Sequence, residues 1–363
     1  MRGFANILDF ASAPDGLNLK LFPVHIIILK MIYGLPLDSR NMIPMNFTVD
    51  RDAKSVTTET KYVERLRSEG RATPENEDEC AHEYKDVALS MGRRSGKSFL
   101  MAVIMAWETW TLLSKGCPQR YFGHSPNNVI QLLVVGTDRD QAGLVHQEVS
   151  GLLRKCDLFK PYLSNATQSF ITLMTPHDLD RETERPTIKL SFKSELTKGL
   201  CGSTNYLVVM DESAHMRNAK DVFLATEPSV RTFTPKNPEN LREMIGPVEG
   251  KVIQISSPIE GGGFFEKMFE LGLCQKNQVR LLSLQIPTWE ANPTIPLSLF
   301  EESRKNSPEF FYQEFGAMSR EFQHTWQTLQ VVRQTLSEYL APRLVEEAVQ
   351  DVRKRLKALP RSR

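Results

Sequence analysis

Residues 86–98 constrain the fold more than any other stretch of this chain. An apolar run leads into a short loop of small and basic residues, and the loop ends in Gly-Lys-Ser at residues 96–98. An apolar helical pattern follows at once, over residues 99–104. A strand, a loop and a helix in this order are typical of a P-loop, in which loop N–H groups and the helix N-terminus bind phosphates. The stretch therefore predicts a nucleoside triphosphate site.

Each residue type in the loop suits phosphate chemistry. Lys97 is long enough to reach the β- and γ-phosphate oxygens, and the Ser98 hydroxyl is a suitable Mg²⁺ ligand. Met91 stands where the G-x-x-x-x-G-K-[ST] pattern has its first glycine, and the neighbouring Gly92 supplies backbone freedom instead. The alternative is a polar turn before an ordinary helix. The predicted phosphate-binding residues are Gly92, Arg94, Ser95, Gly96, Lys97 and Ser98.

A second chemical centre follows the apolar run 206–210. Asp211 and Glu212 come directly after this run, so we expect them at the C-terminal end of a buried strand, where open parallel sheets bind their ligands. In P-loop enzymes the first acid binds Mg²⁺, and a following glutamate can take the proton of the attacking water. The sequence thus predicts Asp211 as a metal ligand and Glu212 as the catalytic base. The alternative is an exposed Asp-Glu turn.

A third apolar run, residues 251–255, ends in Ser256 and Ser257. Hydroxyl groups at the tip of a strand beside the metal site could sense the γ-phosphate and couple its hydrolysis to movement. The alternative is a polar turn followed by a flexible loop, since residues 261–263 are all glycine.

Near the N-terminus, Pro23 begins a helical pattern, a position at which proline is favoured because its missing N–H would be unpaired there. Phe22, Pro23 and His25 could form a flat apolar wall with a polar tip, which suits an adenine ring. Packing in the core is the alternative use of these three side chains.

Further runs extend the α/β pattern. Residues 131–135 read as a buried strand, and Asp138 can cap the helix that follows. We expect the apolar side of that helix to carry Ala142, Leu144, Val145, Val149 and Leu152. Two βα units in succession imply a parallel sheet covered by helices. Residues 191–203 are polar and interrupted by glycine, which predicts a surface loop.

Composition limits the class of protein. With 363 residues, 40% of them hydrophobic and 25% charged, the chain has room for one large α/β domain or two smaller ones. The net charge of +1 means that a nucleic acid would have to be bound by a local patch. The five cysteines form no C-x-x-C pair, which indicates a reducing compartment rather than a disulfide scaffold or a zinc site. We expect no secretory leader and no transmembrane segment.

Taken in order, these motifs resemble the large terminase subunits of tailed bacteriophages. The resemblance covers about residues 17–322 and includes Leu-Phe-Pro at 21–23, the loop 92–98, and the strand and helix at 134–142. The resemblance continues with residues 199–202, which precede the acidic strand end at 208–215, and with the strand end at 255–258. Its last two motifs are Pro-Thr-Trp-Glu-Ala-Asn-Pro at 287–293 and residues 310–316. The family's aromatic-polar adenine motif usually has glutamine where this chain has His25.

The resemblance implies a fold, an activity and partners. The fold is an α/β P-loop NTPase of the additional-strand, catalytic-glutamate type, with a mainly parallel sheet flanked by helices and a small lid-like segment at about 285–322. The activity is ATP hydrolysis with Mg²⁺, driving double-stranded DNA into a procapsid in the host cytoplasm. Arg93, in the middle of the loop, is the expected catalytic arginine beside Lys97 and Glu212. Implied partners are the portal protein, the small terminase subunit and further copies of the chain in a ring.

The C-terminal part departs from this family. Large terminases continue into a nuclease domain, whereas here we expect residues 1–322 to form the ATPase domain and residues 323–363 a basic helical tail, with the nuclease domain absent. Two other functions remain open. A helicase-like or other DNA-dependent ATPase would share the same site chemistry, and a module that binds nucleotide only to assemble with partners would have a damaged acidic pair.

Overall fold

A computed structural model describes residues 3–45, 55–75, 83–181, 185–196, 200, 202–259, 262–274, 281–295, 297–319 and 352. Nearly all of the expected C-terminal tail, 323–363, lies outside these residues, as do Gly199 and Cys201 of one family motif. Within the described part of the chain, no helix combines the length and the apolar character needed to cross a bilayer.

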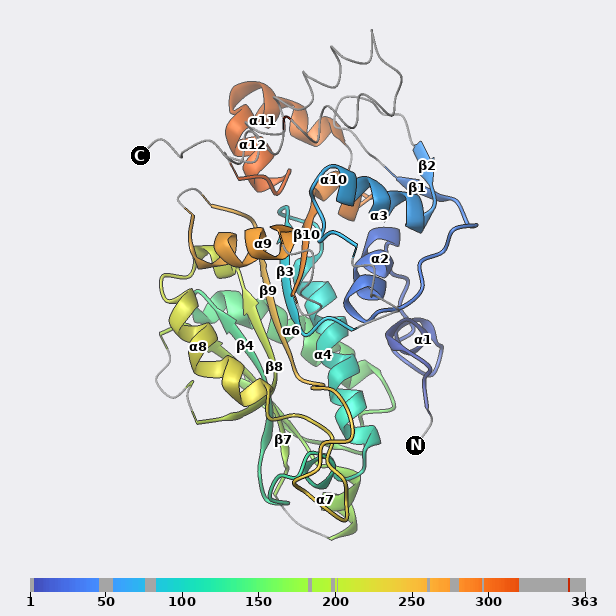
Figure 1. The fold of residues 1–363 in the computed structure, drawn as a ribbon, viewed down its shortest axis with the longest axis vertical. Coiled ribbons are helices and arrows are strands. Elements are labelled where there is room, and N and C mark those ends of the chain that lie inside the picture. Colours follow the sequence, from blue (N-terminus) through green and yellow to red (C-terminus); the bar gives the residue numbers. More distant parts are fainter. Residues whose placement is uncertain are drawn as a thin grey trace.

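An eight-stranded sheet forms the centre of the described molecule (Figure 1). Its strands are β3 (Asp86–Met91), β4 (Ile130–Gly136), β5 (Leu163–Ala166), β6 (Phe170–Leu173), β7 (Ile188–Ser194), β8 (Thr204–Asp211), β9 (Lys251–Ser256) and β10 (Leu281–Ile286). Their order is β10-β3-β9-β8-β4-β7-β6-β5. The strands from β10 to β7 are parallel, and β5 and β6 are antiparallel at one edge. A small hairpin, β1 (Ile43–Met45) with β2 (Ser55–Thr57), is separate.

The strand order confirms the predicted fold class. β9 lies between β3, which enters the P-loop, and β8, which ends in Asp211, and it pairs with both in parallel. This is the additional strand of the predicted type. Because parallel strands end at one edge of a sheet, the loops after β3, β8 and β9 meet there.

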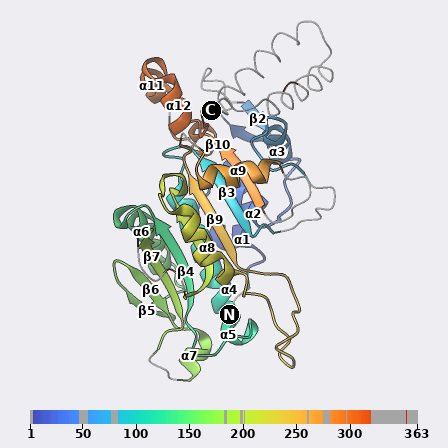
Figure 2. The same ribbon diagram turned by 60° about the vertical axis from the view of Figure 1, so that its left-hand side comes forward.

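Helices cover both faces of the sheet (Figure 2). α4 (Lys97–Ser114) and α6 (Arg139–Lys155) pack in the largest hydrophobic core with α1 (Ile7–Ser12) and α2 (Pro23–Ile32). α8 (Ala219–Val230) and α9 (Phe264–Cys274) pack on the other face, against side chains such as Val208, Val252 and Ala88. Strands covered on both sides by helices are apolar throughout, which is why their sequence runs do not alternate.

The remaining helices lie around this body. They are α3 (Glu59–Ser68), α5 (Pro118–Tyr121), α7 (Pro176–Asp180), α10 (Thr288–Ala291), α11 (Glu301–Asn306) and α12 (Pro308–Glu314), with short 3₁₀ turns η1 (Ser213–His215) and η2 (Leu297–Phe300). α10 to α12 fall in the stretch predicted to be lid-like. A small apolar cluster of Trp289, Phe300 and Phe311 holds this stretch together.

Two local predictions were wrong. Residues 191–194, expected in a surface loop, form the end of β7, because Ser191 and Phe192 are buried between β4 and β6 although the run is partly polar. On α6, Leu144 is 50% exposed, while Leu153 is fully buried with Ala142, Val145 and Val149. The helical period places Leu153, rather than Leu144, on the face against the sheet.

Candidate nucleotide-binding site

The loop 92–96 joins β3 to α4 at the C-terminal edge of the sheet. Two of its residues have left-handed backbone conformations, Arg94 with φ 61° and Gly96 with φ 86°. Lys97 is the first residue of α4, and Ser98 follows in the first turn, half-buried. α4 therefore begins directly behind the loop, with its N-terminal N–H groups at the place where a P-loop binds phosphate.

The structure brings Lys97 and Glu212 into contact. Lys97 Nζ lies 2.8 Å from Glu212 Oε1, and it also donates to the Met91 carbonyl at 3.4 Å. Both side chains are largely buried, with 9% and 19% of their surface exposed. Residues 115 positions apart in the sequence thus form an ion pair because β3 and β8 end at the same edge.

Ser256 and Ser257 contact the same glutamate. The Ser256 hydroxyl donates to Glu212 Oε2 at 3.1 Å, and the Ser257 N–H donates to the same oxygen at 3.3 Å. Glu212 itself has φ 54°, an uncommon backbone conformation for a residue with a side chain. Burial would raise the pKa of Glu212, but the positive charge of Lys97, the hydrogen bond from Lys97 and the one from the Ser257 N–H lower it below the usual value. The carboxylate is therefore held ionised and in one orientation.

Asp211 is almost completely buried beside this pair. Gln141, from the first turns of α6, donates to Asp211 Oδ2 at 3.0 Å. Asp211 Oδ1 has no hydrogen-bond partner among the described residues. Burial, followed by the negative charge of Glu212, raises the pKa of Asp211 to about 6. Sequence reasoning assigned no role to Gln141, because a side chain one helical turn after a cap carries no signal of its long-range partner.

The residues present fit a magnesium ion. Asp211 Oδ1 is a buried carboxylate oxygen without a partner in the described part of the chain, and the Ser98 hydroxyl lies on the adjoining helix. Mg²⁺ prefers such oxygen ligands and normally keeps several waters and substrate phosphate oxygens. No group of three or more His, Cys, Asp or Glu side chains suited to a metal occurs within the described ranges. Most ligands would therefore have to be the phosphates and water.

One of the two loop arginines, Arg93, contacts α12. Arg93 Nε lies 2.5 Å from Glu314 Oε2 at the end of α12, with the arginine side chain 59% exposed. The Arg93 N–H also donates to the Glu314 carbonyl at 2.7 Å. Arg94 is exposed as well. The contact between α12 and the loop was not predicted, since nothing in the sequence of α12 indicates its partner.

The N-terminal residues lie close to the loop. Pro23 is the first residue of α2, and the Phe22 and His25 rings lie 5.4 Å apart. His25 is fully buried, and its Nε2 lies 2.8 Å from the Ser95 carbonyl oxygen. Burial lowers the pKa of His25, although the bond to Ser95 opposes this, so the imidazole is neutral and Nε2 is the donor.

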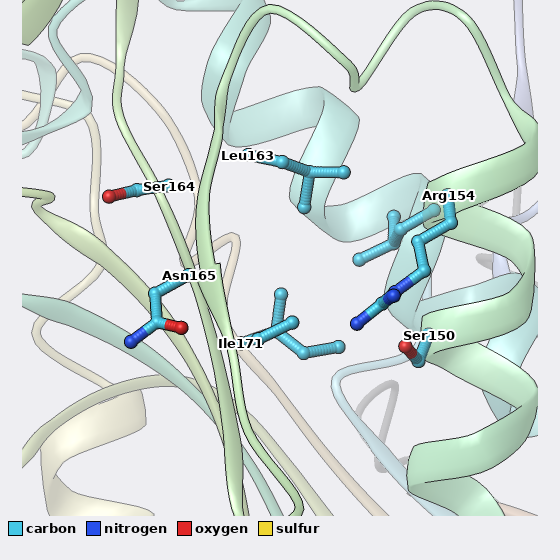
Figure 3. A pocket seen from close by; sticks show the side chains of 8 residues that line it. Ser150, Arg154, Leu163, Ser164, Asn165 and Ile171 are labelled. Atoms are coloured by element: carbon cyan, nitrogen blue, oxygen red, sulfur yellow. The ribbon is translucent and has the colours of Figure 1, made fainter.

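Two hollows lie away from these residues. One, of about 240 Å³, lies between α6 and the β5–β6 edge; in Figure 3 the side chains of Arg154 and Ile171 are directed towards it from opposite sides. The other, of about 470 Å³, adjoins the start of β9 at the opposite end of the sheet strands from the loop, where Lys251 is paired with Glu108. Neither contains a residue of the candidate site.

The family model described as "Uncharacterized protein MJ0330, N-terminal P-loop domain" matches residues 60–314. A search of curated proteins found no match. Among solved structures, the large terminase ATPase domain of Thermus phage P74-26 is 19% identical, with a TM-score of 0.46, and the match covers 65% of this chain and 89% of that one. The large terminase of bacteriophage HK97 is 15% identical, with a TM-score of 0.43 and coverage of 64% and 46%.

Proposed function

The chain belongs to the family of P-loop domains described for MJ0330, and on this premise we propose that it is an ATPase that drives double-stranded DNA into a viral procapsid, as the motor of a terminase large subunit. Membership of a P-loop family supports nucleotide binding. The proposal of hydrolysis rests on the contact of Lys97 with Glu212, which places the phosphate-binding lysine and the expected base at one edge of the sheet.

The proposed chemistry uses residues already in place. The triphosphate lies along the loop 92–96, and Lys97 exchanges Glu212 for a phosphate oxygen. Glu212 is then free to accept the proton of the attacking water, while Ser256 and Ser257 keep its carboxylate oriented. Mg²⁺, held through Asp211 and Ser98, would neutralise phosphate charge. Arg93, in the middle of the loop, is the guanidinium proposed to stabilise the transition state.

The terminase assignment rests on the order of motifs along the chain. Four motifs follow one another as in large terminases: the P-loop, the acidic pair, Ser256 and Ser257 at the end of β9, and the segment 287–293. β9 also supplies the expected additional strand. We extend the proposal to the partners that this family implies: double-stranded DNA, a portal protein on a procapsid, a small terminase subunit and further copies of the chain. Such assembly would place it in the host cytoplasm.

ATP hydrolysis by the purified chain tests this proposal. We expect slow hydrolysis by the protein alone and faster hydrolysis when linear double-stranded DNA and procapsids are both present. Strand separation of a partial duplex would favour a helicase-like translocase. Nucleotide binding without any turnover would favour an assembly module and contradict the proposed ATPase.

A further inference from the structure

Three side chains bind three successive carbonyl groups of the P-loop. Thr288 Oγ1 donates to the Arg93 carbonyl at 2.7 Å, and Asn292 Nδ2 donates to the Arg94 carbonyl at 2.9 Å. His25 Nε2 donates to the Ser95 carbonyl at 2.8 Å. The donors come from α2 and from the α10 segment, which contact each other beside the loop (Figure 1). We call these three donors the carbonyl clamp.

The clamp determines where the loop N–H groups point. The described peptide bonds are all trans, so each N–H is directed opposite to the carbonyl of the same peptide unit. Holding the carbonyls of residues 93, 94 and 95 on one side therefore turns the N–H groups of Arg94, Ser95 and Gly96 to the other side. Successive N–H groups directed into one concavity form an anion-binding nest. The Ser95 N–H bonds to the Gly92 carbonyl at 3.3 Å, a long contact that a phosphate oxygen can replace.

Each donor is itself fixed. Asn292 Oδ1 accepts from the Thr294 N–H at 3.1 Å and from the Thr294 hydroxyl at 2.6 Å, which leaves its Nδ2 directed at Arg94. Thr288 is fully buried, so water does not compete for its hydroxyl group. His25 packs so closely under the loop that a Cβ on Gly96 would lie 2.7 Å from its ring.

A buried ion pair anchors the α10 segment from behind. Glu290 accepts two bonds from the Arg71 guanidinium, at 3.0 and 2.7 Å, and one from the Tyr62 hydroxyl at 2.6 Å. Arg71 is 3% exposed and Glu290 4% exposed. Removing one member of such a pair is costly, so the segment that carries Thr288 and Asn292 is held in place.

We propose that His25, Thr288 and Asn292 are positioning residues for phosphate binding, which act by holding the P-loop carbonyls away from the nucleotide. The inference rests on the proposed ATP site and changes the role of His25 from contact with adenine to support of the loop. It also gives the Thr-x-x-x-Asn spacing of the 287–293 motif a physical reason, because residues four apart on one helical turn reach neighbouring carbonyls.

Inorganic tripolyphosphate with Mg²⁺ tests the clamp, because it binds a P-loop without a base or sugar. The variants are Thr288→Val and His25→Leu, which lose the donor, and Asn292→Asp, which replaces a donor by an acceptor. Loss of one such bond is expected to weaken both ATP and tripolyphosphate about tenfold. The KM for ATP should rise while kcat at saturation changes less.

Matched variants separate this role from general stability. Thr288→Ser and His25→Gln retain a donor and should restore binding. Thr232→Val, whose hydroxyl donates to the Ser229 carbonyl and contacts neither the loop nor the clamp, should bind as the parent does. Unchanged tripolyphosphate affinity in the donor-loss variants, with native melting temperatures, would overturn the proposal. A His25→Leu variant that loses affinity for ATP alone would assign His25 to the base instead. If the parent protein binds neither ligand, the ATP site itself is wrong.

Discussion

At the scale of single residues, the ion pair between Lys97 and Glu212 determines the state of the site. The ammonium group that should bind phosphate and the carboxylate that should accept a proton neutralise each other at 2.8 Å. A nucleotide would separate them by offering Lys97 a stronger anion. On the proposed function, Glu212 would therefore become available as a base only when substrate is bound.

Glu212→Gln should abolish turnover while leaving ATP binding close to that of the parent. The amide keeps the shape of the side chain but cannot accept a proton, and loss of a general base costs about 10²–10⁴ in rate. Single-turnover hydrolysis and equilibrium ATP binding measure the two effects separately. Asp211→Asn is the comparison variant, and it should instead weaken Mg²⁺-dependent binding. Hydrolysis by Glu212→Gln at the parent rate would remove Glu212 from the mechanism.

Arg93→Ala should lose much more turnover than Arg94→Ala. An arginine that stabilises the transition state of phosphoryl transfer is worth about 10³-fold or more in rate, and Arg93 is the favoured candidate by its place in the loop. Its bond to Glu314 uses Nε and leaves the side chain more than half exposed. Steady-state hydrolysis at saturating ATP checks this expectation. Equal, small losses in both variants would contradict it.

At the scale of elements, the close contact between the P-loop and the α10–α12 segment explains why Gly92 is a glycine. A Cβ at this position would lie 2.3 Å from Thr288 Oγ1 and 2.4 Å from the Phe315 carbonyl oxygen. Both neighbours are buried or backbone atoms that cannot move aside cheaply. The loop and the segment after β10 therefore form one packed unit.

Gly92→Ala should both destabilise the protein and weaken phosphate binding. Overpacking of this kind typically costs about 1–3 kcal/mol, and the added methyl group would displace Thr288 from the Arg93 carbonyl. Urea denaturation and tripolyphosphate binding measure the two consequences. Gly143→Ala on α6, where an added Cβ meets nothing within 4 Å, is the matched control. Equal stability of the two variants would show that the contact can relax.

Lys251→Met tests the buried charges at the other end of the strands. Lys251 is 3% exposed and lies 2.8 Å from Glu108 Oε1 and 2.5 Å from Glu83 Oε1. Burial would lower the pKa of Lys251, but these two carboxylates raise it. Without the lysine, Glu108 is buried beside an apolar side chain, which should cost about 3–5 kcal/mol of unfolding free energy. The control is Lys220→Met, on the exposed side of α8, which should change the unfolding free energy little. If urea denaturation shows comparable losses for the two variants, the buried charges do not have the expected effect.

At the scale of the whole molecule, the order of the strands assembles the site. β3, β8 and β9 are far apart in the sequence but adjacent in the sheet, and their ends deliver Lys97, Glu212 and Ser256 to one place. The net charge of +1 provides no global attraction for DNA, so contact with DNA would need a local basic patch.

Deletion of residues 351–363 should reduce the salt dependence of DNA binding. This segment contains Arg353, Lys354, Arg355, Lys357, Arg361 and Arg363 against the single acid Asp351. Fewer phosphate contacts release fewer counterions, so the slope of log affinity against log salt becomes shallower. Hydrolysis without DNA should stay at the parent rate, because all candidate site residues lie upstream. An unchanged slope would indicate that these cations only favour the C-terminal dipole of a helix.

The sequence alone determined the elements whose residues interact locally or bear a strong pattern. The fold class, the P-loop between β3 and α4, and the strand before Asp211 follow from apolar runs and from glycine and lysine at fixed spacing. These signals work because strand burial and helix starts depend mostly on neighbouring residues. The prediction was wrong where polar residues interrupt the apolar pattern, as in β7, where Ser191 is buried next to a strand that is distant in sequence.

Only the tertiary structure decided which side chains meet. The bonds of Thr288 and Asn292 to the loop join residues nearly 200 positions apart, Gln141 reaches Asp211 across 70 positions, and His25 reaches Ser95 across another 70. Such pairs arise from strand order and helix packing, so no local periodicity or propensity encodes them. The carbonyl clamp is therefore invisible in the sequence, although every residue in it belongs to a motif or a helix start that the sequence displays.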